Sequence, residues 1–86
     1  MAEWKHLKYP HLTEKSVTMV ERSNTIVFIV NLKSTKGEIK KEFEQVFEVK
    51  VEKVNTDITS EGKKKAFIQL KPQFRAGDIA VKLGVV

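Results

Sequence analysis

The sequence predicts an α+β fold of the split βαβ type. An apolar stretch, residues 25–32, is followed by a stretch with helical spacing and then by a second strand-like stretch, residues 49–58. Residues 54–70 then read as a hairpin, because a strand ends in a polar turn and returns through three lysines into an apolar strand. A strand–helix–strand unit that continues into a hairpin is typical of this fold class. With 86 residues, the chain is expected to be one small domain.

The first eleven residues are predicted to form an extended arm. Pro10 disfavours helix at the preceding residue, and Trp4 is expected to be a surface aromatic. Thr13 is a good N-cap for a helix over residues 14–21, and the spacing of Leu12 and Val17 is that of a hydrophobic staple. Ser23 and Asn24 should end that helix.

Residues 25–32 form the clearest predicted strand. One face carries Ile26, Phe28, Val30 and Leu32, and the other carries Val27 and Ile29. Apolar residues on both faces are typical of a central strand that is covered on both sides. We therefore expect a sheet with both faces covered and with Phe67 in the core. The alternative is an exposed Phe67, since it lies opposite in phase to Ala66 and Ile68.

The next predicted helix starts at a capping box formed by Thr35 and Glu38. Its inward stripe consists of Ile39, Phe43, Val46 and Phe47. The opposite side carries Lys36, Lys40, Lys41 and Glu44.

The remaining elements are a hairpin and a last helix. The phase of residues 49–58 slips near positions 52–53, which predicts a bulge. A tight turn over residues 59–63 contains Gly62, and the return strand over residues 64–70 buries Ala66, Ile68 and Leu70. A helix over residues 75–83 follows, with Ile79, Ala80 and Leu83 inward and Gly84 as its C-cap.

The charge balance is basic, with 16 Lys and Arg against 11 Asp and Glu and a pI near 9.6. Such a balance favours a nucleic acid or another anionic partner. Only two of these cations are Arg, so the composition favours recognition of phosphates and shape over recognition of base edges. A core cannot accept three consecutive lysines, so at least part of the run Lys63–Lys65 must face solvent or a polyanion, although a lysine run can also simply protect a sheet edge.

Enzymatic and metal chemistry find little support in the sequence. His6 and His11 are poorly placed for a metal, the four glycines form no phosphate loop, and there is no cysteine. We expect no enzyme activity, no metal and no cofactor. The longest apolar run has five residues, so no membrane insertion is expected, and the N-terminus has no apolar signal segment.

Several motifs together resemble one family. They are Y-P-H-L-T-E-K-S (9–16), S-N-T-I-V-F-I-V (23–30), K-G-E-I-K (36–40), F-E-V-K-V-E-K-V-N-T (47–56) and K-K-A-F-I-Q-L-K (64–71). In this order they resemble the universal large-subunit ribosomal protein L23 family, over most of the chain. The tight turn at residues 59–63 resembles the compact form of archaeal members, because bacterial members have a long loop there. Gln69 departs from the basic or threonine residue expected before Leu70, so an RNA contact at that position is in doubt.

The resemblance implies an antiparallel sheet with helices on both faces, in a split βαβ (ferredoxin-like) arrangement. It also implies a cytoplasmic, structural ribosomal protein that binds large-subunit rRNA at the rim of the peptide exit tunnel. Implied partners are neighbouring ribosomal proteins, including L29, and the signal recognition particle with other nascent-chain factors.

The resemblance also assigns roles to residues by matched position. Glu14 is the candidate docking residue for tunnel-exit factors, with a helix N-terminal carboxylate as the alternative. The candidate rRNA contacts form three clusters: Lys8, His11, Thr13 and Lys15; Lys36, Lys40 and Lys41; and Asn55, Thr56, Lys63, Lys64 and Lys65.

Two other functions remain open at this point. One is a regulator that binds RNA or DNA outside the ribosome. The other is a small phosphatase-like enzyme on a similar fold, for which Arg22 and Asn24 are the nearest pair to a phosphate-binding arginine and amide. No glycine-rich loop accompanies that pair.

Overall fold

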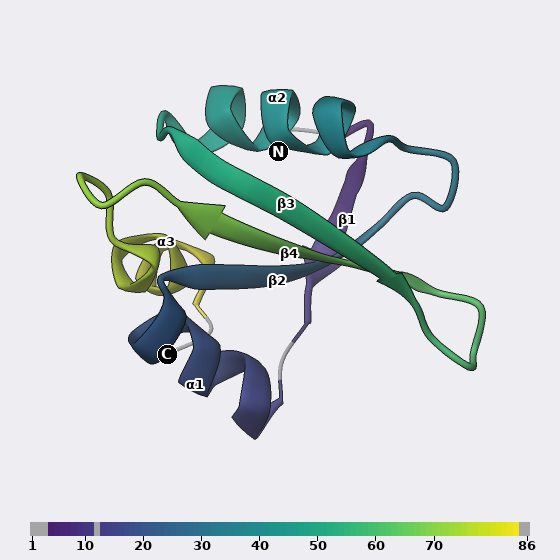
Figure 1. Ribbon diagram of the computed structural model, residues 1–86, viewed down its shortest axis with the longest axis horizontal. Coiled ribbons are helices and arrows are strands. Elements are labelled where there is room, and N and C mark those ends of the chain that lie inside the picture. Colours follow the sequence, from purple (N-terminus) through teal and green to yellow (C-terminus); the bar gives the residue numbers. More distant parts are fainter. Residues whose placement is uncertain (1–3, 12, 85–86) are drawn as a thin grey trace.

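The fold has the predicted α+β class and the split βαβ topology. A computed structural model describes residues 4–11 and 13–84 (Figure 1). Along these residues the elements are β1 (Leu7–Pro10), α1 (Glu14–Ser23), β2 (Thr25–Val30), α2 (Lys36–Phe47), β3 (Val51–Ile58), β4 (Lys64–Leu70) and α3 (Ala76–Leu83). The four strands form one antiparallel sheet in the order β1-β2-β4-β3, so β4 lies between the two strands that α2 connects.

The core lies between the sheet and α2, and buried residues of α3 (Ala76, Ile79 and Ala80) belong to the same cluster. All six residues of β2 are buried, as predicted for a central strand. Phe28 points to α2, where its ring centroid lies 5.8 Å from that of Phe43, and Phe43 lies 4.6 Å from Phe47. Trp4 also packs here, 5.7 Å from Phe28. The prediction of a surface Trp4 is therefore wrong, because the arm turns its ring onto this aromatic cluster.

The arm becomes a strand because Glu42 of α2 holds it. The Glu42 carboxylate accepts the backbone N–H groups of Lys5, His6 and Leu7 at 2.8, 2.7 and 2.8 Å. Burial opposes ionisation of this carboxyl, but the three N–H donors outweigh it, so the pKa of Glu42 falls below its ordinary value of 4.5. The sequence analysis predicted an extended arm but not its pairing with β2.

The helix α1 begins and ends with well-formed caps. The Thr13 hydroxyl accepts the Ser16 N–H at 3.1 Å, and the Ser16 hydroxyl accepts the Thr13 N–H at 2.9 Å. The predicted staple partner Leu12 lies outside the described residues. The helix continues to Ser23, two residues beyond the predicted end, because Asn24 supplies the left-handed cap at φ 51°.

Asn24 also ties α1 to the start of α3. Its side-chain amide donates to the Phe74 carbonyl at 2.8 Å and accepts from the Ala76 N–H at 2.7 Å. These bonds fix the turn that precedes α3. The helix itself starts at Ala76, one residue later than predicted, and Gly84 caps its end at φ 74°.

The hairpin has the predicted form. The register shifts between Val51 and Lys53, where the bulge was expected. Gly62 adopts φ 79° in the turn, and Thr59 donates its N–H to the Lys63 carbonyl at 2.7 Å. The strand β3 begins at Val51, two residues later than predicted, because residues 48–50 form the connection from the end of α2.

Two residues predicted to be inward are exposed. Leu32 is 53% exposed because β2 ends at Val30 and the chain turns immediately afterwards. Val46 is 37% exposed because it lies at the margin of the apolar stripe of α2.

The second face of the sheet is covered only in part. In Figure 1, α1 and α2 lie on opposite sides of the strands, and α1 packs beside β2. Toward β3 this face is open, since Asn55 and Asp57 are exposed. Phe67 on the same face is only half-buried, so its predicted place in the core is wrong. The reason is that α1 is too short and too far toward β2 to cover it fully.

Candidate nucleic-acid interface

The three lysines before and within β4 do not act as one group. Alternation along the strand sends neighbouring side chains to opposite faces. The Lys64 ammonium turns to the core side and donates to the Ser34 carbonyl at 2.7 Å. Lys65 shares the open face with Phe67, two positions later, and Lys63 is exposed just before the strand. The charges available to a partner are therefore those of Lys63 and Lys65.

The residues after β1 reach the same place from another part of the chain. His11 donates its N–H to the Val27 carbonyl at 2.9 Å, which holds it beside β2. Thr13 and Lys15 follow as the cap and the first turn of α1. These residues and β4 enclose a shallow hollow of about 60 Å³, named here the Phe67 hollow. It is lined by His11, Thr13, Lys15, Ser16, Met19, Val27, Lys65 and Phe67.

The charge distribution around the Phe67 hollow is positive. Partial burial lowers the pKa of His11 below its ordinary value of 6.5, and the charges of Lys65 and Lys63 lower it further. The lowered pKa favours the neutral imidazole, which lies close to two cations. None of the residues that line the hollow is acidic.

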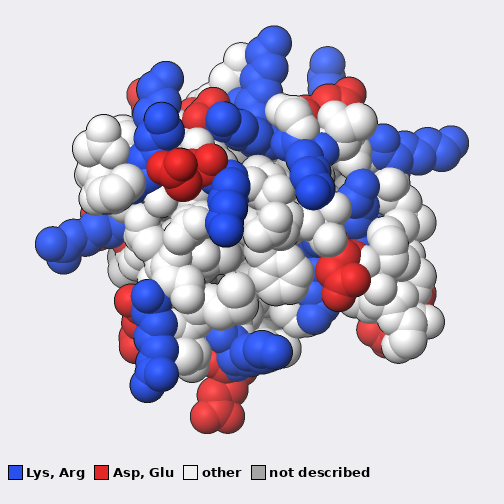
Figure 2. Space-filling model, viewed as in Figure 1, with Lys and Arg blue, Asp and Glu red and all other residues white. Residues whose placement is uncertain are grey.

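Asp57 is the acidic residue that pairs in the sheet with a residue of the Phe67 hollow. It pairs with Lys65 across the hairpin, on β3, and so lies on the side of β4 away from α1. Figure 2 shows the wider setting, an uncharged centre over β2 and β4 that is surrounded by Lys and Arg side chains with several Asp and Glu side chains among them. A polyanion could contact the surrounding cations while an uncharged group rests on the centre.

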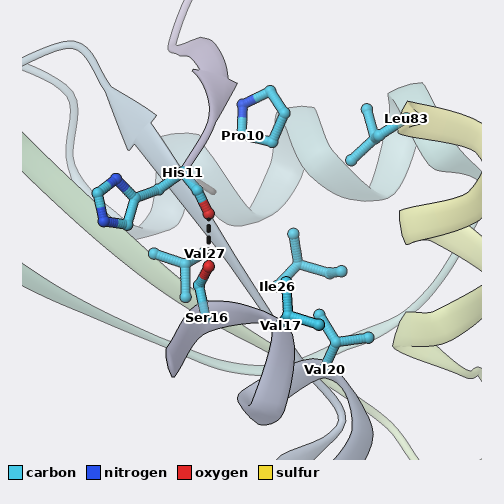
Figure 3. A pocket seen from close by; sticks show the side chains of 8 residues that line it. All are labelled: Pro10, His11, Ser16, Val17, Val20, Ile26, Val27 and Leu83. Carbon is cyan, nitrogen blue, oxygen red and sulfur yellow. Dashed lines mark hydrogen bonds between the residues drawn. The ribbon is translucent and has the colours of Figure 1, made fainter. Parts of the chain in front are cut away.

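A second, smaller hollow lies on the other side of His11. It measures about 20 Å³, is lined mainly by apolar side chains, and includes Pro10 and Leu83 (Figure 3). The His11 ring points away from both residues, while its carbonyl accepts the Ser16 hydroxyl at 2.7 Å. This space holds at most about one water molecule, so it is a packing gap and not a ligand site.

The other predicted contacts lie at varied places. Lys8 is exposed on the edge strand β1. Asn55 pairs with Phe67 and is exposed on the open face, whereas Thr56 is half-buried beside the buried Ala66 on the core side. Glu14 is exposed as the first residue of α1.

The lysines of α2 form a separate surface. Lys36 and Lys41 are exposed and Lys40 is half-buried. Because α2 lies on the opposite side of the strands from α1, this surface is not continuous with the Phe67 hollow (Figure 1). The structure thus brings part of the first predicted cluster (His11, Thr13 and Lys15) beside part of the third (Lys63 and Lys65). The second cluster, the lysines of α2, lies apart from both.

Comparisons with known proteins decide the family. A family model described as ribosomal protein L23 matches residues 5–75. The chain is also 50% identical over 76 residues to the large ribosomal subunit protein uL23 of Methanothermobacter thermautotrophicus, covering 88% of each chain. The chain belongs to the ribosomal protein L23 family. It is a structural protein of the large ribosomal subunit, as the sequence motifs indicated.

Some features of this L23-family chain were missed in the sequence. The half-exposed Phe67 was assigned to the core, although Lys65 and Phe67 occur at a spacing of two, which places them on one face of the strand. Ser16 and Met19 of the hollow gave no local signal. Among the described residues, no group of three His, Asp or Glu is placed to hold a metal ion, and none of the helices there is long and apolar enough to cross a membrane.

Proposed function

We propose that this chain binds large-subunit rRNA near the peptide exit tunnel, in cytoplasmic ribosomes, and helps to form a docking site for nascent-chain factors. The observation that supports this most directly is the convergence of His11, Thr13 and Lys15 with Lys63 and Lys65. These residues lie about fifty positions apart in sequence. A site without acidic lining that combines several cations favours a phosphate backbone as the partner.

The chemistry of the site points to contacts with phosphates and sugars. Lysine ammonium groups attract phosphates as point charges, without the fixed fork with which arginine reads guanine. The exposed Thr13 hydroxyl accepts one hydrogen bond from Ser16 and can still donate its own proton to a phosphate oxygen. The site is therefore suited to holding a folded RNA in place rather than to selecting a short sequence.

The salt dependence of binding tests this proposal. The RNA used is in vitro transcribed large-subunit rRNA, and the affinity of the protein for it is measured over a series of salt concentrations. The double variant Lys63→Gln and Lys65→Gln should reduce the slope of log affinity against log salt by roughly 1.4–1.8 units, at about 0.7–0.9 per lost phosphate contact.

Lys64→Gln is the matched control for that experiment. It removes the same charge from the neighbouring position, but the ammonium of Lys64 is bound to Ser34 on the core side. Its slope should stay close to that of the parent chain. Equal slopes for all variants would contradict the proposed contact with phosphates.

Membership in the ribosome is tested separately. The chain should remain in stoichiometric amount on purified large subunits after a high-salt wash, beside neighbouring proteins such as L29. Complete loss in the wash would favour a regulator that acts outside the ribosome.

Factor docking is proposed at Glu14. Its position in the first turn of α1 leaves the side chain exposed, one residue before Lys15 of the rRNA site. A carboxylate there can pair with a cationic side chain of an incoming factor, and such pairs are worth several kcal/mol only when water is excluded.

Glu14→Ala should therefore leave ribosome assembly intact and weaken the binding of the signal recognition particle several-fold. The affinity is measured with empty ribosomes at equal occupancy of this protein. Glu21→Ala, at an exposed carboxylate near the end of the same helix, is the control. Equal affinities for the parent and Glu14→Ala would remove Glu14 from the docking site, whereas loss of occupancy would indicate a role in rRNA binding or folding.

A further inference from the structure

Phe67 is an aromatic residue in an unusual place for a strand of this sheet. Its neighbours along β4, Ala66 and Ile68, are fully buried, while Phe67 faces the incompletely covered side. Its cross-strand partner Asn55 is exposed. Phe67 thus lies between two paired strands, with part of its surface open to solvent.

The walls of the Phe67 hollow differ in chemistry. Phe67, Val27 and Met19 provide apolar surface, while Lys65, Lys15 and Thr13 provide donors at the margin. A ligand that matches both must carry a flat apolar group and anionic or acceptor atoms close to it. Nucleotides have this combination, and aromatic side chains on a sheet are used elsewhere to stack unpaired bases.

We propose that the Phe67 hollow receives a single unpaired nucleotide of RNA, with its base against the Phe67 ring and its phosphate next to Lys65 and Lys63. This inference rests on the proposed function, and it adds the kind of RNA feature that the site takes. The volume of about 60 Å³ is too small to enclose a nucleoside. The base therefore lies over the hollow and is not enclosed by it, so the face of the base that points away from Phe67 stays accessible to the rest of the RNA.

His11, which lines the hollow, contributes to the same recognition. A neutral imidazole offers one donor and one acceptor, which suits the edge of a base better than a charged ring would. Asn55, exposed across the hairpin from Phe67, adds an amide on the opposite side of the ring. Both groups tolerate more than one base, so we expect selection for an unpaired nucleotide and little selection among the four bases.

The test compares variants that change the ring with variants that change the charge, on the same in vitro transcribed large-subunit rRNA. Phe67→Leu keeps an apolar side chain but removes the flat ring. It should lower affinity roughly tenfold, because stacking of a base is lost, and it should leave the salt slope unchanged. Phe67→Trp should restore most of the affinity. Tyr9→Leu removes an exposed aromatic of β1 outside the hollow and should bind like the parent.

A second measurement locates the nucleotide without any substitution. Ultraviolet cross-linking of the parent chain to the rRNA, followed by tryptic digestion, should yield the peptide of residues 66–75 with a nucleotide attached at Phe67, because trypsin does not cleave between Lys71 and Pro72. Thermal melting of each variant is recorded, so that a loss of fold is recognised.

The outcomes separate the two proposals. No binding of the parent chain to the rRNA at low salt would overturn the proposed function. Binding of the parent together with equal affinity of Phe67→Leu, or adducts only on other peptides, would overturn the nucleotide site alone. A folded Phe67→Leu that loses affinity but is not rescued by Phe67→Trp would also contradict stacking.

Discussion

Replacement of Glu42 by alanine is expected to detach β1 from the rest of the fold. The carboxylate accepts three backbone N–H groups, those of Lys5, His6 and Leu7. The Lys5 group is exposed, so water can replace its acceptor. The other two are partly buried, and an unsatisfied group of this kind costs about 1–3 kcal/mol. Because both groups are only partly buried, the lower part of that range applies to each, and we expect Glu42→Ala to lower the free energy of unfolding by roughly 2–4 kcal/mol.

Glu42→Gln separates the role of the charge from that of the acceptor. The amide keeps one carbonyl oxygen, which in the place of Oε1 can still accept from both His6 and Leu7, so less than half of the loss is expected. Urea denaturation measures the global effect, and hydrogen exchange at the Leu7 amide measures release of the strand. Gln45→Ala, at an exposed position of the same helix, is the control. Unchanged midpoints together with unchanged exchange at Leu7 would refute the reasoning.

The same contact predicts a pH dependence. The folded chain lowers the pKa of Glu42 below 4.5, so the folded state favours the ionised carboxylate. Its contribution to stability is complete above about pH 4.5 and is lost as the pH falls through the folded pKa. The parent chain should lose more stability than Glu42→Gln as the pH is lowered through this range.

Three further outcomes are expected. Phe43→Ala should cost about 3–5 kcal/mol in unfolding free energy, because it empties the centre of the aromatic cluster; a parent-like melting curve would contradict this core. Glu48→Gly should raise stability by about 0.5–1 kcal/mol in denaturation, since Glu48 adopts φ 55° at the end of α2; a loss would mean that the side chain makes a contact of its own. An NMR titration should place the pKa of His11 below 6.5, and replacing Lys63 and Lys65 by Gln should raise it. Because His11 has a lower pKa in the folded chain than in the unfolded chain, its contribution to folding stability is complete above about pH 6.5 and is lost as the pH falls. The double variant should lose less stability over this range. An unchanged pKa of His11 in the double variant would show that these lysines do not act on it.

Local signals in the sequence were sufficient for most of the elements. The Thr35 and Glu38 capping box, the phase slip in β3 and the glycines at positions 62 and 84 each determine backbone geometry within a few residues. Such features depend on neighbouring positions, so they can be read without knowledge of the tertiary structure.

The features that were missed depend on contacts between distant segments. Glu42 binds an arm about 35 positions away, and no periodicity reveals that pairing. The apolar residues on both faces of β2 correctly indicated cover on both sides, but they gave no information on how far α1 extends over β4. For this reason Phe67 was assigned to the core. Strand alternation predicts that Lys64 and Lys65 point to opposite faces of the sheet. It does not predict that Lys64 binds the Ser34 carbonyl, which lies thirty positions away.

The strand order also determines when the sheet can be completed during synthesis. The buried strand β2 pairs on its inner edge with β4, where Thr25 meets Gln69, and β4 is made long after β2. Until β4 has left the ribosome, β2 exposes one unpaired edge and much apolar surface, which are the features that favour association with other chains. The nascent chain is therefore expected to be most prone to aggregation after α2 has been made and before Leu70 emerges. Closure of the hairpin between β3 and β4 ends that interval, and a stalled chain truncated before β4 should bind chaperones more strongly than the full chain.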